Sequence, residues 1–369
     1  MRGTRRRGPD GERGLAPHWR ALLLGGAGLA LAGSMVVGSL TAGPGTPREP
    51  TPGTGTAEAT RASLHDETPT RVRERCGDGD EGEGEGDGEG EGEGGGENGD
   101  GEGFDPAESL RPSREGGPAV DEIRERGSLI VGIDQNSYRW GYRLPESGEI
   151  VGFDIDLARA IAEDLLGPDP DIVFRAIPTD QREEALEAGT VDMVVRSMSI
   201  TCDRLDEVAF STSYFETGQQ LLVPGDSTIT DFDESMAGQR VCSASGSTAS
   251  RWLERESHGA VLLERPNHLD CLVLIQLGLA EALMTDSALA AGHMGQDPSM
   301  RLVGPQLTSE SYGVAMALGN DDLVRWVNAV LDDYRGDGPD SPWHRSFEEW
   351  LSGYLPEAAN DPPEPLYHD

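Results

Sequence analysis

The chain has 369 residues, and 67 acidic residues against 30 basic ones give it a formal net charge of −37. So acidic a chain excludes DNA or RNA as a partner, because phosphate binding needs clustered basic residues. The length allows two ordinary domains. Four cysteines occur without any CxxC pair, which argues against a zinc ribbon or a thioredoxin-type site.

The first 42 residues carry an export pattern. Six arginines precede an uncharged, largely apolar stretch at 21–42. This pattern predicts a cleaved signal sequence, or an uncleaved membrane anchor, since the stretch is long enough to cross a bilayer. In both cases we expect the protein on the extracellular face of the cytoplasmic membrane, either anchored or secreted. Disulfides are typical of that oxidising compartment, and the cysteine count is even.

Two low-complexity segments follow. Residues 43–75 are rich in Pro, Thr and Gly, and residues 77–103 nearly alternate Gly with Asp or Glu. Such segments bury too little apolar surface to fold, and like charges spread along glycine extend the chain. The acidic tract lacks the aliphatic position of the calcium-binding nonapeptide repeat. We therefore predict a disordered, solvated linker over 43–119.

Regular structure is expected from about residue 120. The pattern predicts a short helix at 120–124, a buried strand at 129–133 and a hairpin turning at 147–148. Asp154 is expected to cap a helix that runs to about 166 with its apolar residues on one face. A strand at 172–174, a helix ending at Gly189 and a strand at 191–195 follow.

Strands and helices continue to alternate toward the C-terminus. Strands are predicted at 220–223, 240–243, 261–263, 282–284 and 312–318. Helices are predicted at 248–257, 269–279, 287–294, 321–334 and 342–351. Such alternation is typical of parallel sheets covered by helices, and two such lobes would account for the length. The Pro-rich tail after Tyr354 is expected to be loose.

One segment carries a family resemblance. The sequence GFDIDLARAIA at 152–162 is similar, position by position, to the signature of the extracellular solute-binding proteins of family 3, which capture polar amino acids. The similarity extends over about 127–354. Further segments resemble the actinobacterial glutamate/glutamine-type branch: SLRP at 109–112, TCDR at 201–204, RVC at 240–242 and DCL at 270–272.

The resemblance implies an α/β fold. This is a two-lobed, periplasmic-binding-protein-like (type II) clamshell with two hinge strands, preceded by a disordered N-terminal region. The chain would cross between the lobes near 219–224 and return near 309–314. The expected segments are 1–42 (signal or anchor), 43–119 (linker), 120–219 (first part of lobe 1), 220–310 (lobe 2), 311–355 (second part of lobe 1) and 356–369 (tail).

An amino acid needs an anion pocket beside a cation pocket, and segment 197–204 supplies the first candidates. The resemblance implies that Ser197 and Ser199 bind the ligand ammonium and that Arg204 binds the carboxylate. A guanidinium is suited to this role because its planar fork matches a carboxylate. The alternative is that Arg204 pairs with Asp206 or Glu207 on the surface.

Two later segments join a strand to a helix. Backbone N–H groups at a helix start bind anions, so Ser247 and Thr248 are candidates for the ligand carboxylate. The resemblance implies that Asp286, with Thr285 beside it, binds the ammonium. The alternative for both segments is an ordinary helix cap.

Side-chain selection rests on residues after the first strand and on two arginines. Asp134, Asn136 and Tyr138 are expected to face the cleft, with the Tyr138 ring against the ligand stem, as in many relatives. Arg182 and Arg196 could receive a ligand carboxylate, which would favour glutamate or aspartate, or both could be exposed. Ala244 stands where some glutamine binders carry Lys.

The four cysteines allow two bridges. Cys242 and Cys271 fall in the same lobe, on a strand and near a helix start, and we expect them to pair. Cys76 would then pair with Cys202 and tie the linker to lobe 1.

These observations predict a binding protein without a catalytic residue, cofactor or metal. The ligand would be glutamate, aspartate, glutamine or asparagine, and the lobes would close on it by hinge motion. We expect a monomer whose partner is an ABC permease or a membrane signalling receptor. The alternatives are a cyclohexadienyl-dehydratase-like enzyme on the same fold and a wall protein that uses its acidic tract.

Overall fold

The computed structural model describes residues 72–77, 103–355 and 360–368. All of them belong to one compact unit. The predicted signal or anchor at 1–42 and most of the predicted linker lie outside the described residues. Within the described ranges, every helix is too short or too polar to cross a membrane.

The first lobe is built on a mixed sheet. Its main path runs β1 (Val72–Arg73), β16 (Thr308–Ala317), β8 (Met193–Ser199), β3 (Ser128–Ile133) and β7 (Asp171–Ala176). Strands β9 (Val208–Phe210) and β10 (Phe215–Thr217) also pair with β16. Strand β3 is parallel to β7 and β8, whereas β16 is antiparallel to β8. The parallel centre agrees with the expected alternation of strands and helices.

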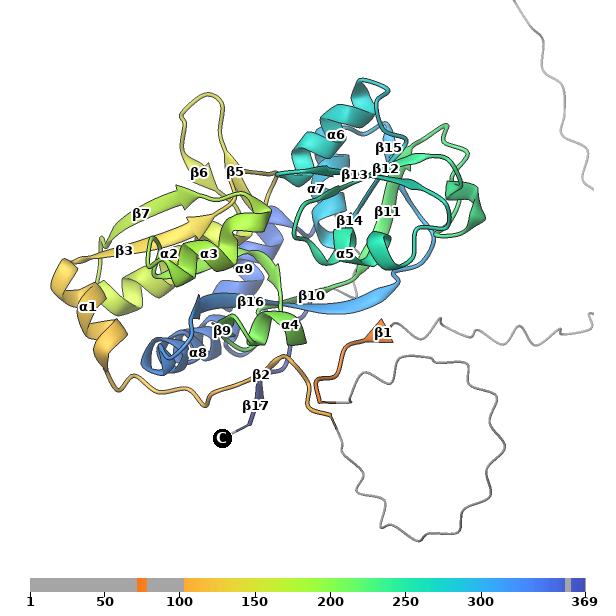
Figure 1. Ribbon diagram of the computed structural model, residues 1–369. Helices are drawn as coiled ribbons and strands as arrows, with labels where there is room; N and C mark the ends of the chain where they lie inside the picture. Colours follow the sequence, from red (N-terminus) through yellow and green to blue (C-terminus); the bar gives the residue numbers. More distant parts are fainter. Residues whose placement is uncertain (1–71, 78–102, 356–359, 369) are drawn as a thin grey trace, which may run out of the picture. The chain divides into compact units, whose positions relative to one another are not determined.

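Helices cover both faces of this sheet. They are α1 (Pro118–Arg126), α2 (Phe153–Leu166), α3 (Arg182–Glu187), α4 (Cys202–Leu205), α8 (Asp321–Arg335), α9 (Pro342–Trp350) and the 3-10 turn η1 (Thr179–Gln181). Helices α2, α8 and α9 pack together, while α3 packs on β8 and β16 (Figure 1). Alternate residues of β8 enter different apolar clusters, as expected for a strand buried on both sides. A small sheet of β4 (Asn136–Ser137), β5 (Gly141–Arg143) and β6 (Ile150–Val151) adjoins.

The second lobe has its own five-stranded sheet. Its order is β13 (Val261–Arg265), β12 (Arg240–Ala244), β14 (Ala282–Asp286), β11 (Gln219–Pro224) and β15 (Met300–Val303). Its helices are α5 (Thr248–Arg255), α6 (His268–Gln276), α7 (Ser287–Gln296) and the 3-10 turn η2 (Glu234–Met236). The helices and strands from 240 to 351 match those predicted, except that β15 was not predicted. Two apolar clusters lie on the two faces of the sheet.

The chain passes between the lobes twice. Strand β10 ends at Thr217 in the first sheet and β11 begins at Gln219 in the second. The return lies between β15 and β16. A Cβ at Gly218 would lie 2.0 Å from the Thr308 carbonyl oxygen, so no side chain fits where the two connections meet. The two crossing segments therefore lie backbone against backbone.

The segments that precede and follow the lobes in the sequence are more ordered than predicted. Ser109 donates its hydroxyl to the Phe210 carbonyl at 2.7 Å, and Asn328 donates to the Leu110 carbonyl at 2.7 Å. Strand β2 (Glu108–Ser109) pairs with β17 (Leu366–Tyr367) from the tail. The predicted linker therefore extends too far at its end, and the prediction of a loose tail is wrong for 360–368. Polar anchors from distant elements hold both segments, and such contacts leave no periodic pattern.

Both expected disulfides are present. Cys76 pairs with Cys202 and Cys242 with Cys271, at Cα–Cα distances of 5.5 and 5.4 Å. The first bridge attaches the segment before the acidic tract to the start of α4.

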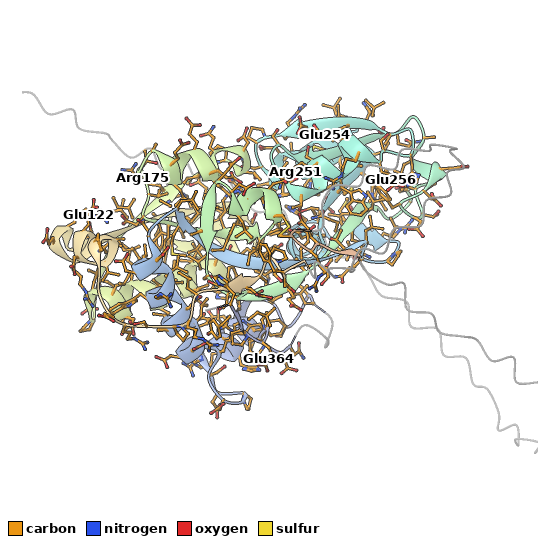
Figure 2. The ribbon with its side chains drawn as sticks, turned by 60° about the horizontal axis from the view of Figure 1, so that its bottom comes forward. Glu122, Arg175, Arg251, Glu254, Glu256 and Glu364 are labelled. Atoms are coloured by element: carbon orange, nitrogen blue, oxygen red, sulfur yellow. A yellow bond between two sulfur atoms is a disulfide. The ribbon has the colours of Figure 1, made fainter. Side chains whose placement is uncertain are left out.

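Charged side chains are spread over the surfaces of both lobes (Figure 2). Glu122 of α1, Glu254 of α5 and Glu364 near the C-terminus are all exposed. Exposed carboxylates such as these favour solubility.

Candidate ligand-binding site

A polar cavity lies between the two lobes. Its free volume is about 10 Å³, room for about one water molecule. The first lobe contributes Thr179, Arg182, Ser197, Ser199 and Arg204. Gln219 lines the cavity where β11 of the second sheet begins. The second lobe contributes Ser247, Thr248, Ala249, His268, Thr285 and Asp286. Nearly all of these side chains are polar and buried, so the lobes are closed on one another.

Eight of the twelve predicted ligand-binding residues line this cavity. They are Arg182, Ser197, Ser199, Arg204, Ser247, Thr248, Thr285 and Asp286. The other four, Asp134, Asn136, Tyr138 and Arg196, do not line it. The cavity therefore unites the polar ends of β8, β12 and β14, as expected where strands of α/β proteins end.

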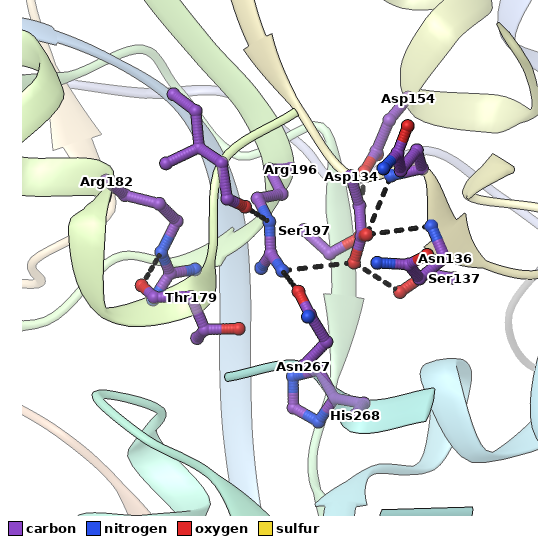
Figure 3. Close-up of polar contacts among 12 residues, drawn as sticks. Asp134, Asn136, Ser137, Asp154, Thr179, Arg182, Arg196, Ser197, Asn267 and His268 are labelled. Atoms are coloured by element: carbon purple, nitrogen blue, oxygen red, sulfur yellow. Dashed lines mark hydrogen bonds and ion pairs between the residues drawn. The ribbon is translucent and has the colours of Figure 1, made fainter. Parts of the chain in front are cut away.

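Asp134 and Arg196 are turned toward each other. Their side chains form a buried ion pair at 3.1 Å, and Asp134 also accepts from the Ser137 hydroxyl at 2.7 Å and from the Asn136 amide (Figure 3). The Tyr138 ring packs edge-on against Tyr142 and lies beside α7. The charged groups of Asp134 and Arg196 are thus already paired with each other, and none of the four residues lines the cavity.

Arg204 is held at the centre of the cavity by both lobes. Its side chain is 2% exposed. It donates to the Ser199 carbonyl at 2.7 Å, to the Gly246 carbonyl of the second lobe at 2.9 Å and to the Glu183 carboxylate at 3.0 Å. The alternative pairing with Asp206 or Glu207 does not occur. Burial lowers the pKa of Arg204, and the neighbouring Glu183 acts in the opposite direction.

Arg182 is a second buried guanidinium in the same cavity. It donates to the carbonyls of Thr179 at 2.8 Å and Gly246 at 3.4 Å (Figure 3). Among the described residues, no carboxylate forms an ion pair with it. Burial and the nearby Arg204 lower its pKa well below the usual range. The nearby Glu183 opposes this shift only in part and lies outside ion-pair distance. A buried guanidinium without a directly paired carboxylate favours an incoming anion.

Asp286 stands at the start of α7 and faces the cavity. It occupies the N-cap position, yet its side chain makes no capping hydrogen bond. Its carboxylate accepts instead from the Tyr312 hydroxyl at 2.6 Å and from the Gln219 amide. Burial, reinforced by the negative Glu310, raises its pKa well above the usual range. Ser247, by contrast, does cap α5 by accepting from the Ser250 amide.

Glu310 is a site residue that the sequence reasoning missed. Its carboxylate accepts from Ser199 at 2.6 Å, Thr248 at 2.8 Å, Gln219 at 2.8 Å and Thr308 at 3.0 Å. The hydroxyl protons of Ser199 and Thr248 are thus committed to Glu310. The Thr248 oxygen also accepts from the Gln219 side-chain amide at 2.8 Å, so Ser199 is the better placed of the two to accept from a ligand.

A strand-periodic pattern could have revealed Glu310. Thr308, Glu310 and Tyr312 alternate along β16, so their side chains share one face of the strand. All three bond to groups of the cavity. A larger cavity of about 230 Å³ lies behind Glu310, but it contains neither Arg204 nor Asp286.

The arrangement places two guanidinium groups opposite acceptors in one closed space. Arg182 and Arg204 are the basic groups, and Asp286 and the neighbouring Glu310 are the acidic ones. Among the described residues no cluster of His, Cys, Asp or Glu is arranged to hold a metal ion. The chemistry that this cavity suits is recognition of a small molecule bearing both carboxylate and ammonium groups.

Known proteins share this architecture. The family model of the bacterial extracellular solute-binding proteins, family 3, matches residues 129–352. The ABC transporter glutamine-binding protein GlnH of Bacillus subtilis is 33% identical over 229 residues, 62% of this chain and 83% of that protein. The glutamate-binding protein GluB of Corynebacterium efficiens is 28% identical over 257 residues, 66% of this chain and 84% of that protein.

A solved structure is similar as well. An ancestral arginine-binding protein bound to glutamine has a TM-score of 0.57 and 31% identity, covering 61% of this chain and 98% of that chain. The expected type II periplasmic-binding-protein fold is thereby confirmed. Because the family match spans more than half of the chain, the whole five-stranded sheet and every residue of the cavity, the chain belongs to the bacterial extracellular solute-binding proteins, family 3.

Proposed function

We propose that the protein captures an acidic amino acid, glutamate or aspartate, outside the cytoplasmic membrane and delivers it to an ABC importer. The observation that carries the proposal is the pair of buried guanidinium groups, Arg182 and Arg204, in one cavity with Asp286. An acidic amino acid brings two carboxylates and one ammonium to this set.

Each ligand group has a partner of the right kind. The α-carboxylate would bind Arg204 and the first amides of α5, and the ammonium would bind Asp286, Ser197 and Ser199. The side-chain carboxylate would reach Arg182. Glutamine and asparagine would leave that buried guanidinium without a directly paired carboxylate, and for this reason we place them second, although relatives named for glutamine are similar to this chain.

Binding requires the lobes to open. The free volume of about 10 Å³ cannot admit an amino acid. Opening would break hydrogen bonds across the cleft, and closure would re-form them. Examples are Thr179 N–H to the Pro266 carbonyl and Trp140 Nε1–H to the Ala288 carbonyl. The lobes would rotate about the crossing at Gly218. The re-closed form would present both lobes to the permease.

Oligomeric state, location and partner complete the proposal. We propose a monomer that is held at, or released from, the outer face of the membrane by the segment at 1–42, with no catalytic step. A membrane signalling receptor is the alternative partner. Calorimetric titration of the full chain with glutamate, aspartate, glutamine and asparagine tests the central claim, which fails if none of them binds.

Specificity is expected to change when Arg182 loses its charge. In Arg182→Gln, glutamate should bind at least tenfold more weakly while glutamine affinity changes little, because an amide side chain needs no cation. Calorimetry with both ligands measures the ratio. Arg175→Ala, which removes an exposed arginine of β7, is the control. Equal loss for both ligands would show that Arg182 supports the cavity without selecting the side chain.

Closure is expected to depend on Gly246. Its φ is +71°, and a Cβ there would lie 2.9 Å from Cα of Asp180 in the other lobe. Gly246→Ala should therefore weaken ligand binding tenfold or more by holding the cleft ajar. Gly238→Ala is a matched control, since Gly238 has φ +73° in the same lobe with no atom within 4 Å of the added Cβ. Small-angle scattering with saturating ligand would report whether the altered protein still closes.

A further inference from the structure

The backbone of Ser197 is strained where it lines the cavity. Its φ is +43°, in the left-handed region that side-chain-bearing residues rarely adopt. Along β8, Val194 pairs with Ala315 and Met198 with Gly313, so three residues of β8 stand opposite the single residue Val314. Such a bulge re-aims a side chain or a carbonyl at a functional site.

A buried network holds this bulge from below. The Ser197 hydroxyl donates to the Asp154 carboxylate at 2.8 Å, and the Ser197 amide donates to the Tyr214 hydroxyl at 3.1 Å. Tyr214 in turn donates its hydroxyl to Asp154 at 2.8 Å. The three groups come from the start of α2, the end of β8 and the segment between β9 and β10, and all three are buried. Figure 3 shows Asp154 and Ser197. The hydroxyl and the backbone N–H of Ser197 are therefore both held by hydrogen bonds to this network.

The GFDID segment places Asp154 under the bulge. Gly152 has φ +131°, and a Cβ there would lie 2.3 Å from the Trp140 carbonyl oxygen, so only glycine allows the chain to enter α2 here. The expected role of Asp154 as the helix cap is wrong, because Gly152 occupies that position. Asp156, two residues on, faces α9 instead and accepts from Ser346 and Trp350.

We propose that Asp154 is a positioning residue of the ligand site, which acts with Tyr214 to hold Ser197 in the conformation that the ligand ammonium requires. This inference rests on the proposed function and explains why the segment that carries the family resemblance lies next to the binding cavity. Burial raises the pKa of Asp154 to about 7, with Asp134 the nearby charge that adds to the effect. Burial likewise raises the pKa of Tyr214 well above its usual range, so its hydroxyl keeps the proton that it donates.

The first test uses the full chain and compares two substitutions in the first turn of α2. In Asp154→Asn the side-chain oxygen can still accept from one of the two hydroxyls, Ser197 or Tyr214. The NH₂ group, which is itself a donor, faces the other hydroxyl and cannot accept from it. Calorimetry with glutamate should then show at least tenfold weaker binding. Asp156→Asn, which alters the same residue type away from the bulge, should bind within twofold of the unaltered protein.

The second test separates positioning from general destabilisation. Glycine adopts a positive φ without strain, so Asp154→Asn combined with Ser197→Gly should recover most of the lost affinity. A variant that is merely less stable would not be rescued by removing another side chain. Thermal melts establish that each variant is folded, and Tyr214→Phe replaces Asp154→Asn in both comparisons if the latter does not fold.

The outcomes decide between the two claims. If the unaltered chain binds no amino acid, the proposed function fails and the role of Asp154 falls with it. If the unaltered chain binds but the folded Asp154→Asn variant binds equally well, only the positioning role is refuted. Equal affinities of the single and the double variant, both weakened, would also refute it, since release of backbone strain would then have no effect.

Discussion

Replacing Arg204 with alanine will weaken glutamate binding by about 3–5 kcal/mol, a loss of roughly two to four orders of magnitude in affinity. The guanidinium is 2% exposed and bridges the two lobes through the carbonyls of Ser199 and Gly246. Without it, the ligand carboxylate would be buried opposite uncharged groups, and the closed form would lose a contact between the lobes. Isothermal titration calorimetry on the folded variant measures the effect.

Two companion variants separate charge from geometry. Arg204→Lys keeps a positive charge but loses the planar fork, so we expect an intermediate loss. Arg175→Ala removes an arginine that lies on the surface (Figure 2) and should leave the affinity unchanged. An Arg204→Ala variant that binds within threefold of the unaltered protein would remove Arg204 from the site.

Ligand binding is expected to release a proton from Asp286. Burial and the neighbouring Glu310 raise the pKa of this carboxyl well above the usual range, so it tends to hold a proton when no ligand is bound. An ammonium placed beside it favours the ionised form and lowers the pKa. Affinity should therefore rise with pH until the pH exceeds the raised pKa, and level off above it.

Calorimetry in two buffers with different ionisation enthalpies tests this coupling. The apparent binding enthalpy should differ between phosphate and Tris for the unaltered protein. Asp286→Asn should abolish most of that difference and weaken binding by about 2–4 kcal/mol, because the ammonium loses its anionic partner. Asp171→Asn, at an exposed position, serves as the control. Identical enthalpies in the two buffers for the unaltered protein would contradict the prediction.

The sequence alone predicted most of the local structure. Helices α5 to α9 and strands β11 to β14 lie within a few residues of their predicted bounds, because each has an apolar pattern of the right period and a start or stop signal beside it. The two disulfides were also correctly paired. Arg204 and Asp286 were named because their segments resemble a known family, and the structure places both at one cavity.

Only the tertiary structure revealed the groups that orient those residues. Glu310, Gln219 and Tyr312 bond to residues up to 111 positions away. The strand period places Glu310 and Tyr312 on one face of β16, but it does not say which groups that face meets. Asp154 was taken for a cap, because its local signal as an acid at a helix start is the same whether it points to the helix or into the core. Asp134 and Arg196 neutralise each other across two strands.

What the sequence by itself determined were the elements, the export pattern and the identity of the charged groups, since these depend on periodicity, composition and local spacing. What the fold decided was which charges face one another, which hydroxyls are committed as donors and which flanking segments are ordered. Those outcomes depend on hydrogen bonds between residues far apart in the chain. Partners of that kind are selected by the packing of two lobes, and no local pattern encodes them.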